Sequence, residues 1–283
     1  MTAKISSALT AAATLILLSA PLATAQDVKR SLTQVTDDIW RFDNNNHATM
    51  VVVTDAGVVV GDPINAAAAG WLKDEIATRF DQPVTHMIYS HHHSDHTTGG
   101  EVFAGAEIYA HALYPELAKS IGTQTAMPTQ TFEGETSFTV GDKTFELTHL
   151  GIDGHGEDMI VSIVRPDNVA FVVDVVSPGR LPWQRIPTGS IDGMIGQIET
   201  LEALSYDIIL PGHSRNGTKA DATALKGYLT DLRGTVQASL DAGKSEADVI
   251  ADAKTAMADY KNWLAYDFLF EANVKGMIGH LTN

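Results

Sequence analysis

Four histidines and one aspartate lie within six residues in the segment His91-His92-His93-Ser94-Asp95-His96, which closes an apolar run at residues 84–89. Residues two apart on an extended chain point to the same side, so His91 and His93 can bind one ion. If the chain then bends, Asp95 and His96 can reach a second ion beside it. Neutral imidazoles and carboxylates without thiolates suit zinc first, and iron or manganese next. The segment therefore predicts a metal site rather than a histidine-rich surface loop.

Three further candidate ligands lie where an apolar stretch gives way to a loop. His155 stands in Asp153-Gly154-His155-Gly156, Asp174 follows the apolar residues 171–173, and His213 follows Pro211-Gly212. Because α/β enzymes place their chemistry at the ends of strands, we expect these three side chains to join the histidine segment in one site.

The order and approximate spacing of seven residues resemble those of the metallo-β-lactamase superfamily of metallohydrolases: His91, His93, Asp95, His96, His155, Asp174 and His213. The resemblance covers nearly the whole mature chain, from about Leu32 onward. It implies that the first metal is bound by His91, His93 and His155. It implies further that Asp95, His96 and His213 bind the second metal and that Asp174 bridges the two. The fold it implies is of the α+β class, an αββα sandwich in which two mixed sheets are flanked by helices and the metals lie at one edge.

The chemistry expected of such a centre is hydrolysis. Two divalent ions that share a water lower its pKa towards neutrality and supply hydroxide at physiological pH. The carboxylates of Asp95 and Asp174 would orient that hydroxide and take up a proton during attack. The resulting hypothesis is an exported hydrolase with two zinc ions per chain, iron or manganese being the other candidates. Its small-molecule substrate would be an ester, lactone, amide or thioester, and β-lactams remain candidates.

Two other functions stay open. A mononuclear iron dioxygenase of the persulfide type shares the first-site ligands. A non-catalytic periplasmic accessory protein could keep the fold without turnover, although buried, converging His and Asp side chains are costly to keep without metal. Within the family, the di-iron oxygen reductases carry Glu where this chain has His93, which argues against the redox branch. The zinc β-lactamases with a Cys at the second metal differ from this chain at Asp174, which glyoxalase II and lactonases share.

The composition limits the partners and the compartment. The 283 residues are 44% hydrophobic, contain no cysteine and carry a formal charge of −16. That charge argues against a nucleic-acid groove, which needs clustered Lys and Arg. Lys4, the apolar stretch 8–20 and Ala23-Thr24-Ala25 read as a signal peptide cleaved after Ala25. We therefore expect a periplasmic or secreted protein, without stable membrane insertion after processing, whose hydrolase domain covers residues 26–283 and ends in a helical segment.

Short strands and helices are expected to position the ligands. Alternating apolar residues and turn signals predict strands at 38–42, 49–53, 57–60, 84–89, 160–164, 169–173 and 208–210, with two more inside 131–150 joined at Gly141-Asp142. Helical periodicity predicts helices at 66–80, 112–121 and 190–204 and over nearly all of the chain beyond Ala220.

Several residues outside the ligand set have two possible roles. Asp62 could orient a ligand or cap a turn, and His47 could face the site or lie in a solvated turn. Trp183 could line a substrate pocket or pack under its Pro-rich loop. His92 points away from its neighbours on an extended chain, so a supporting role is expected rather than metal binding. Four more histidines carry no motif and are expected in the core or on the surface: His86, His111, His149 and His280.

Overall fold

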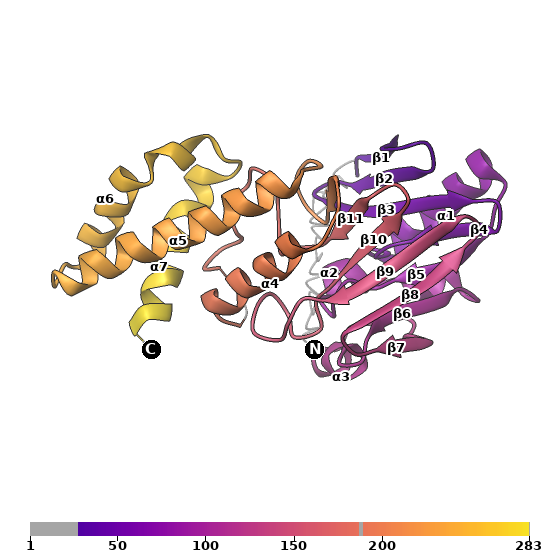
Figure 1. Cartoon of the computed structure of the whole chain (residues 1–283), viewed down its shortest axis with the longest axis horizontal. Helices are drawn as coiled ribbons and strands as arrows, with labels where there is room; N and C mark the ends of the chain where they lie inside the picture. Colours follow the sequence, from indigo (N-terminus) through magenta and orange to yellow (C-terminus); the bar gives the residue numbers. More distant parts are fainter. Residues whose placement is uncertain (1–27, 187–188, 283) are drawn as a thin grey trace, which may run out of the picture.

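The computed structural model describes residues 28–186 and 189–282 of the chain. The signal peptide expected at residues 1–25 lies outside the described residues. Two β-sheets stack on one another, and helices cover their outer faces (Figure 1). The expected αββα sandwich of the α+β class is confirmed.

The first sheet holds seven strands that are neighbours in chain order. They are β1 (Arg30–Gln34), β2 (Ile39–Asn44), β3 (His47–Thr54), β4 (Gly57–Val60), β5 (Val84–Ile88), β6 (Glu107–His111) and β7 (Gln130–Phe132). The strands β1 to β4 pair antiparallel, whereas β4 to β7 pair parallel. The sheet is therefore mixed, and the carboxyl end of β5 lies beside those of its parallel neighbours.

The second sheet has the strand order β12-β11-β10-β9-β8. Its strands are β8 (Glu135–Val140), β9 (Lys143–His149), β10 (Ile160–Arg165), β11 (Val169–Val172) and β12 (Ile208–Pro211). Only β11 and β12 pair parallel, so their carboxyl ends lie at the same edge of the sheet. This is the edge at which the sequence places Asp174 and His213.

The helices that surround the sheets are α1 (Ala66–Phe80), α2 (Ser94–Thr97), α3 (Tyr114–Ser120), α4 (Ile191–Ala203), α5 (Lys219–Asp241), α6 (Glu246–Ala256) and α7 (Tyr266–Thr282). Two 3₁₀ turns, η1 (Gly100–Phe103) and η2 (Ala258–Asn262), complete the described elements. The side chain of Asn65 caps α1 and that of Ser190 caps α4, as short polar side chains do at helix starts. Among the described helices, none has the length and apolar character of a membrane span.

The side-chain alternation of the strands separates three apolar layers. On β4, Val58 and Val60 pack under α1, whereas Val59 faces the second sheet. On β10, Val161 and Ile163 face α4 and the C-terminal helices, whereas Val164 faces the first sheet. Because successive side chains on a strand point to opposite faces, strands covered on both sides have no polar face. Their continuous runs of valine and isoleucine follow from that burial.

The C-terminal helices form one end of the molecule, beyond the second sheet (Figure 1). The long helix α5 packs against α4, α6 and α7. Its apolar face joins the same core cluster as α4 and β10, through Leu225, Tyr228, Leu229 and Leu232. The expectation of a helical chain beyond Ala220 is confirmed.

Candidate metal centre

The predicted ligands come from the ends of strands in both sheets. The segment His91–His96 follows β5 and ends in the one-turn helix α2, while His155 lies in the loop between β9 and β10. Asp174 follows β11, and His213 follows β12. Seven predicted ligands therefore meet at one edge of the sandwich, although the first, His91, and the last, His213, are 122 positions apart in the sequence. The structure brings all seven into two clusters.

The first cluster consists of His91, His93, His155 and Asp174, whose candidate ligand atoms lie within 4.8 Å of one another. His93 Nδ1 is 2.8 Å from His91 Nε2 and 3.2 Å from His155 Nε2. Asp174 Oδ2 lies 3.3 Å from His155 Nε2 and 3.7 Å from His91 Nε2. Three imidazole nitrogens and a carboxylate oxygen that face a common point make a donor set that suits zinc.

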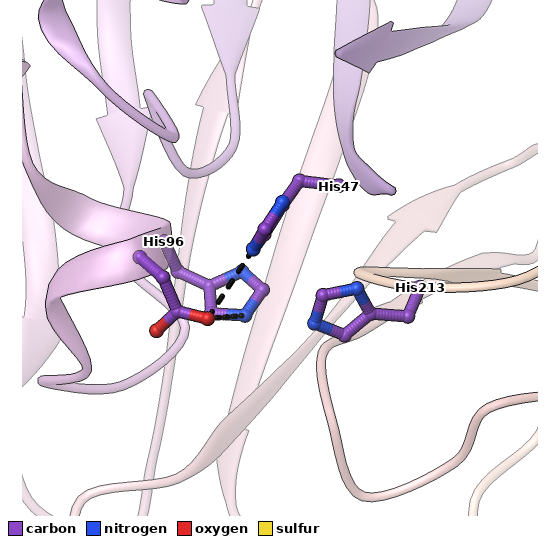
Figure 2. Close-up of side chains that lie close together, drawn as sticks. His47, His96 and His213 are labelled. Atoms are coloured by element: carbon purple, nitrogen blue, oxygen red, sulfur yellow. Dashed lines mark hydrogen bonds and ion pairs between the residues drawn. The ribbon is translucent and has the colours of Figure 1, made fainter. Parts of the chain in front are cut away.

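The second cluster consists of His47, Asp95, His96 and His213. The three histidines converge from separate elements in Figure 2, with His47 at the start of β3. Asp95 Oδ2 lies 3.3 Å from His47 Nε2 and 3.6 Å from His96 Nε2. The sequence had left His47 undecided between the site and a solvated turn, and the structure places it in the cluster. The residue before His47 contacts the same cluster, because the carbonyl oxygen of Asn46 lies 2.6 Å from His213 Nδ1.

Asp174 lies between the two clusters. Its Oδ2 is 3.1 Å from His96 Nε2, and its Oδ1 is 3.2 Å from His213 Nε2. Its backbone φ is 59°, a left-handed conformation that is uncommon outside glycine and is often found at functional sites. The placement agrees with the bridging role that the resemblance implied.

The polar atoms of the centre fit divalent ions. Both ring nitrogens of His96 and Oδ1 of Asp174 are buried without a hydrogen bond of good geometry among the described residues. Their contacts are ion pairs, with Asp174 Oδ2 3.1 Å from His96 Nε2 and Oδ1 3.2 Å from His213 Nε2. Such unsatisfied buried groups are costly unless something binds them. Burial opposes protonation of His96, yet Asp174, Asp62 and Asp95 outweigh it and raise the pKa of His96 to about 9. This negative field favours a cation at the centre.

The protonation states of the other ligands agree with metal binding. Burial and the neighbouring His93 hold the pKa of His91 well below its usual value. Burial and His155 lower the pKa of His93 to about 4. Burial alone would raise the pKa of Asp174, but His96 and His155 hold it well below the usual range. At neutral pH these groups are neutral imidazoles and a carboxylate, the forms in which they bind metals.

A family comparison accounts for this arrangement. The sequence model of the metallo-β-lactamase superfamily matches residues 45–213, which is more than half of the chain and spans every residue of both clusters. The chain belongs to the metallo-β-lactamase superfamily. The two clusters fit the binuclear metal site of that superfamily.

One curated protein and one solved structure illustrate what the chain is similar to. The 2,4-dinitroanisole O-demethylase subunit alpha of Nocardioides sp. (strain JS1661) is 27% identical over 246 residues, which cover 83% of this chain and 70% of that protein. The solved structure of a metallo-beta-lactamase from Pontibacter korlensis superposes with a TM-score of 0.64 at 20% identity. That superposition covers 72% of this chain and 100% of the other, so it supports the superfamily fold alone.

A buried carboxylate and a serine support the histidine segment of this metallo-β-lactamase fold. Asp62 accepts hydrogen bonds from Ser90 N at 2.8 Å and from Ser90 Oγ at 2.6 Å. Its Oδ2 also lies 3.9 Å from His96 Nδ1. Burial raises the pKa of Asp62 to about 6. Asp62 therefore lies where it can orient a ligand, one of the two roles expected for it.

His92 and Gln197 hold the two loops of the first cluster. His92 belongs to neither cluster, in agreement with the expected supporting role, and its Nδ1 lies 2.7 Å from Asp158 Oδ1. Gln197 of α4 is 1% exposed. Its Oε1 accepts a hydrogen bond from His155 N at 2.8 Å, and its Nε2 donates to Gly151 O at 2.9 Å. Sequence analysis does not identify Gln197, because nothing in a helix pattern marks which polar residue reaches a distant loop.

A cavity of about 480 Å³ opens beside the clusters. His47, His93, Asp95, His155, Asp174 and His213 line its polar side. The remaining walls are mostly apolar and include Ile121, Pro182, Trp183, Met194 and Leu225, with Arg180 among them. Trp183 therefore lines the pocket, one of the two roles that the sequence allowed. A mostly apolar pocket with a few convergent polar groups is typical of a small-molecule site.

The remaining histidines lie outside both clusters. His86 stacks on Phe138 with ring centroids 5.4 Å apart, and His111 stacks on His149 at 3.9 Å. His280 lies in the last turn of α7. These positions agree with the core and surface roles expected for them.

Proposed function

We propose that the protein is an exported metal-dependent hydrolase that binds two divalent ions and cleaves an ester, lactone, amide or thioester bond in a small molecule, with β-lactams among the candidates. The position of Asp174 carries this proposal, since its Oδ2 lies 3.3 Å from His155 Nε2 of the first cluster and 3.1 Å from His96 Nε2 of the second. A carboxylate so placed can belong to both ions. Zinc is the favoured metal because the donors are imidazoles and carboxylates without thiolates.

When bound, the metal pair lowers the pKa of water and polarises the bond to be cleaved. The chain supplies the remaining functions. Asp174 and Asp95 are anionic, since His96 and His155 lower the pKa of the former and His47 and His96 bring that of the latter to about 2. Asp95 lines the pocket with its side chain 56% exposed, so its carboxylate can orient a water molecule there. The apolar walls reduce the access of other water to the substrate.

The proposal extends to a substrate size and charge. A cavity of about 480 Å³ suits a small organic molecule. A chain with a formal charge of −16 repels polyanions at long range, so neither RNA nor DNA is proposed as a substrate. The similar protein from Nocardioides is named for removing a methyl group from an aromatic ether, and 2,4-dinitroanisole therefore belongs in a substrate panel.

The test combines metal analysis with a substrate panel. The purified mature protein is expected to hold about two equivalents of metal and to hydrolyse at least one member of a panel of chromogenic esters, lactones, thioesters, cephalosporins and 2,4-dinitroanisole. His93→Ala should lose the first ion and nearly all turnover. His280→Ala is the matched control, because this histidine lies outside both clusters.

The alternatives give different results in the same test. An iron dioxygenase would hold one iron ion and depend on oxygen, whereas the proposed hydrolase is indifferent to oxygen. An accessory protein would hold metal and turn over no member of the panel. Activity that survives an excess of chelator in metal-free protein would refute the metal-dependent mechanism.

A further inference from the structure

The loop from Gly179 to Ile186, between β11 and α4, forms one wall of the pocket. Arg180, Pro182 and Trp183 of this loop line the cavity. The guanidinium carbon of Arg180 lies 5.6 Å from the centre of the Trp183 ring. An arginine and a tryptophan side by side next to a metal centre offer a charge and a flat apolar surface to the same ligand.

The C-terminal helix α7 holds this loop in place. Asn273 of α7 is fully buried, and its Nδ2 donates to Pro182 O at 2.9 Å and to Gln184 O at 2.6 Å. Its Oδ1 accepts from Tyr228 of α5 at 2.9 Å. The backbone of Leu264 also pairs with the loop, because its N–H donates to Gly179 O at 2.8 Å. Both N–H groups of the Asn273 side-chain amide therefore donate to the loop that forms the pocket wall.

The backbone of the loop is strained, which indicates that its shape is imposed by these contacts. Gln184 and Ile186 have φ values of 46° and 55°. A positive φ is unfavourable for Gln and more so for the β-branched Ile. Gly276 of α7 approaches so closely that a side chain there would meet the carbonyl of Arg185. Such strain persists only where the surroundings determine the conformation.

The Arg180 guanidinium is available to a ligand. Among the described residues, no carboxylate lies within 4 Å of it, whereas Arg79 and Arg41 each have such a partner. Burial lowers the pKa of Arg180, and the carboxylate of Asp174 is the one charge that opposes this. If Asp174 belongs to the metal pair, the charge of Arg180 is open to an anionic group of a ligand.

Two large apolar side chains at the pocket are exposed, whereas Met194 and Leu225 are buried. Trp183 is 47% exposed and Ile121, on another wall, is 50% exposed. Large apolar side chains that gather around a pocket mark a surface that a ligand covers. An aromatic ring stacks on tryptophan more favourably than an aliphatic chain of the same area does.

We propose that Arg180 and Trp183 form a subsite for an aromatic ring that carries an anionic group, so that the substrate is a small aromatic anion. This inference rests on the proposed function, because it describes the substrate of that hydrolase. The anionic group binds the guanidinium of Arg180, and the ring lies on Trp183 beside the metal centre.

Binding of unreactive probes tests the subsite without turnover. The probes are phenylacetate, which has ring and charge, phenylacetamide, which has the ring alone, and acetate, which has the charge alone. Calorimetry on the metal-loaded wild type is expected to give a dissociation constant for phenylacetate at least about tenfold lower than for either other probe. Arg180→Gln should remove the preference for phenylacetate over phenylacetamide, and Arg180→Lys should retain part of it. Trp183→Ala should weaken both aromatic probes about fivefold and leave acetate unchanged.

Arg79→Gln is the matched control. Arg79 lies 6.0 Å from the ring centre of Trp40 but outside the pocket, so its loss should change no binding constant. The subsite is refuted if Arg180→Gln keeps the preference for the anion, if acetate binds as tightly as phenylacetate, or if no probe binds. Metal content is measured on each variant and should stay at the wild-type value. A protein that hydrolyses nothing would refute the proposed function while these constants still decide the subsite. If the protein is a hydrolase but the dissociation constants of the probes are unchanged in Arg180→Gln, the subsite alone is refuted.

Discussion

Gln197→Ala tests whether α4 holds the His155 loop in position for metal binding. The wild-type side chain accepts one hydrogen bond from His155 N and donates to Gly151 O and to Gly156 O, at 2.8 Å, 2.9 Å and 3.3 Å. The side chain is buried, so the alanine variant leaves three backbone groups without partners. At about 1 kcal/mol each, the loss is about 3 kcal/mol in the free energy of unfolding. For a domain of this size, that lowers the Tm by roughly 6 to 12 °C.

The assay is urea unfolding of the metal-loaded protein together with metal analysis. We expect the metal content of Gln197→Ala to fall from about two to about one equivalent, because the loop that presents His155 loses its fixed position while the second cluster keeps its own supports. Gln237→Ala is the control, since Gln237 lies on the exposed face of α5 and, among the described residues, its side chain bonds only to Asp241, at 2.8 Å. Its effect should stay within about 0.5 kcal/mol.

A second variant separates the hydrogen bonds from the volume of the side chain. Gln197→Glu keeps an acceptor for His155 N but turns oxygens towards the carbonyls of Gly151 and Gly156. It should therefore destabilise the protein at least as much as the alanine variant does. The reasoning is refuted if both variants lose less than about 1 kcal/mol, or if they are destabilised and still hold two ions as tightly as the wild type.

Three other changes have defined outcomes. Asp174→Asn should reduce the occupancy of both ions together in metal analysis, because the neutral amide faces both clusters; loss of one ion alone would contradict the bridging role. Burial and then His149 lower the pKa of His111 below 6.5, so the unfolded chain takes up a proton first and the free energy of unfolding falls as the pH drops below that value. His111→Gln should flatten this fall in urea titrations from about pH 8 to about pH 5, and an unchanged slope would count against it. N-terminal sequencing of the exported protein should begin at Gln26, and a chain that begins at Met1 would refute cleavage.

The sequence predicted the elements whose signals are local. Helix α1 occupies 66–80 as expected, and the meander of β2, β3 and β4 follows its turn signals closely. The strands β1, β6 and β7 were missed. Each begins with a polar residue and lacks the unbroken apolar sequence of the equally short β4, β11 and β12, and each pairs with a neighbouring strand. Such pairing depends on the partner and leaves little trace in the segment itself.

The candidate site likewise contains residues that a local sequence signal marks and residues that no such signal marks. The seven predicted ligands carry signals in their spacing and in their positions at strand ends, and the structure brings all of them together. His47 carried a weaker signal, since one histidine beside three asparagines is as typical of a turn as of a site. Gln197, Asp158 and Asn273 carried none, because their roles depend on contacts across 41 to 91 positions of sequence, from Gln197 with Gly156 to Asn273 with Pro182. Arg180 carried no signal either.

The metal clusters and the pocket wall are held by different elements of the fold. The metal clusters depend on strand ends and on α4, whereas the wall that carries Arg180 and Trp183 depends on α7 through Asn273. The family match ends at residue 213, so α7 lies outside the segment that defines the superfamily. Substitutions on the side of α7 that faces the loop can therefore move the pocket wall while the metal ligands stay in place. A chain built in this way can keep one metal centre and alter the pocket beside it through a helix outside both ligand clusters.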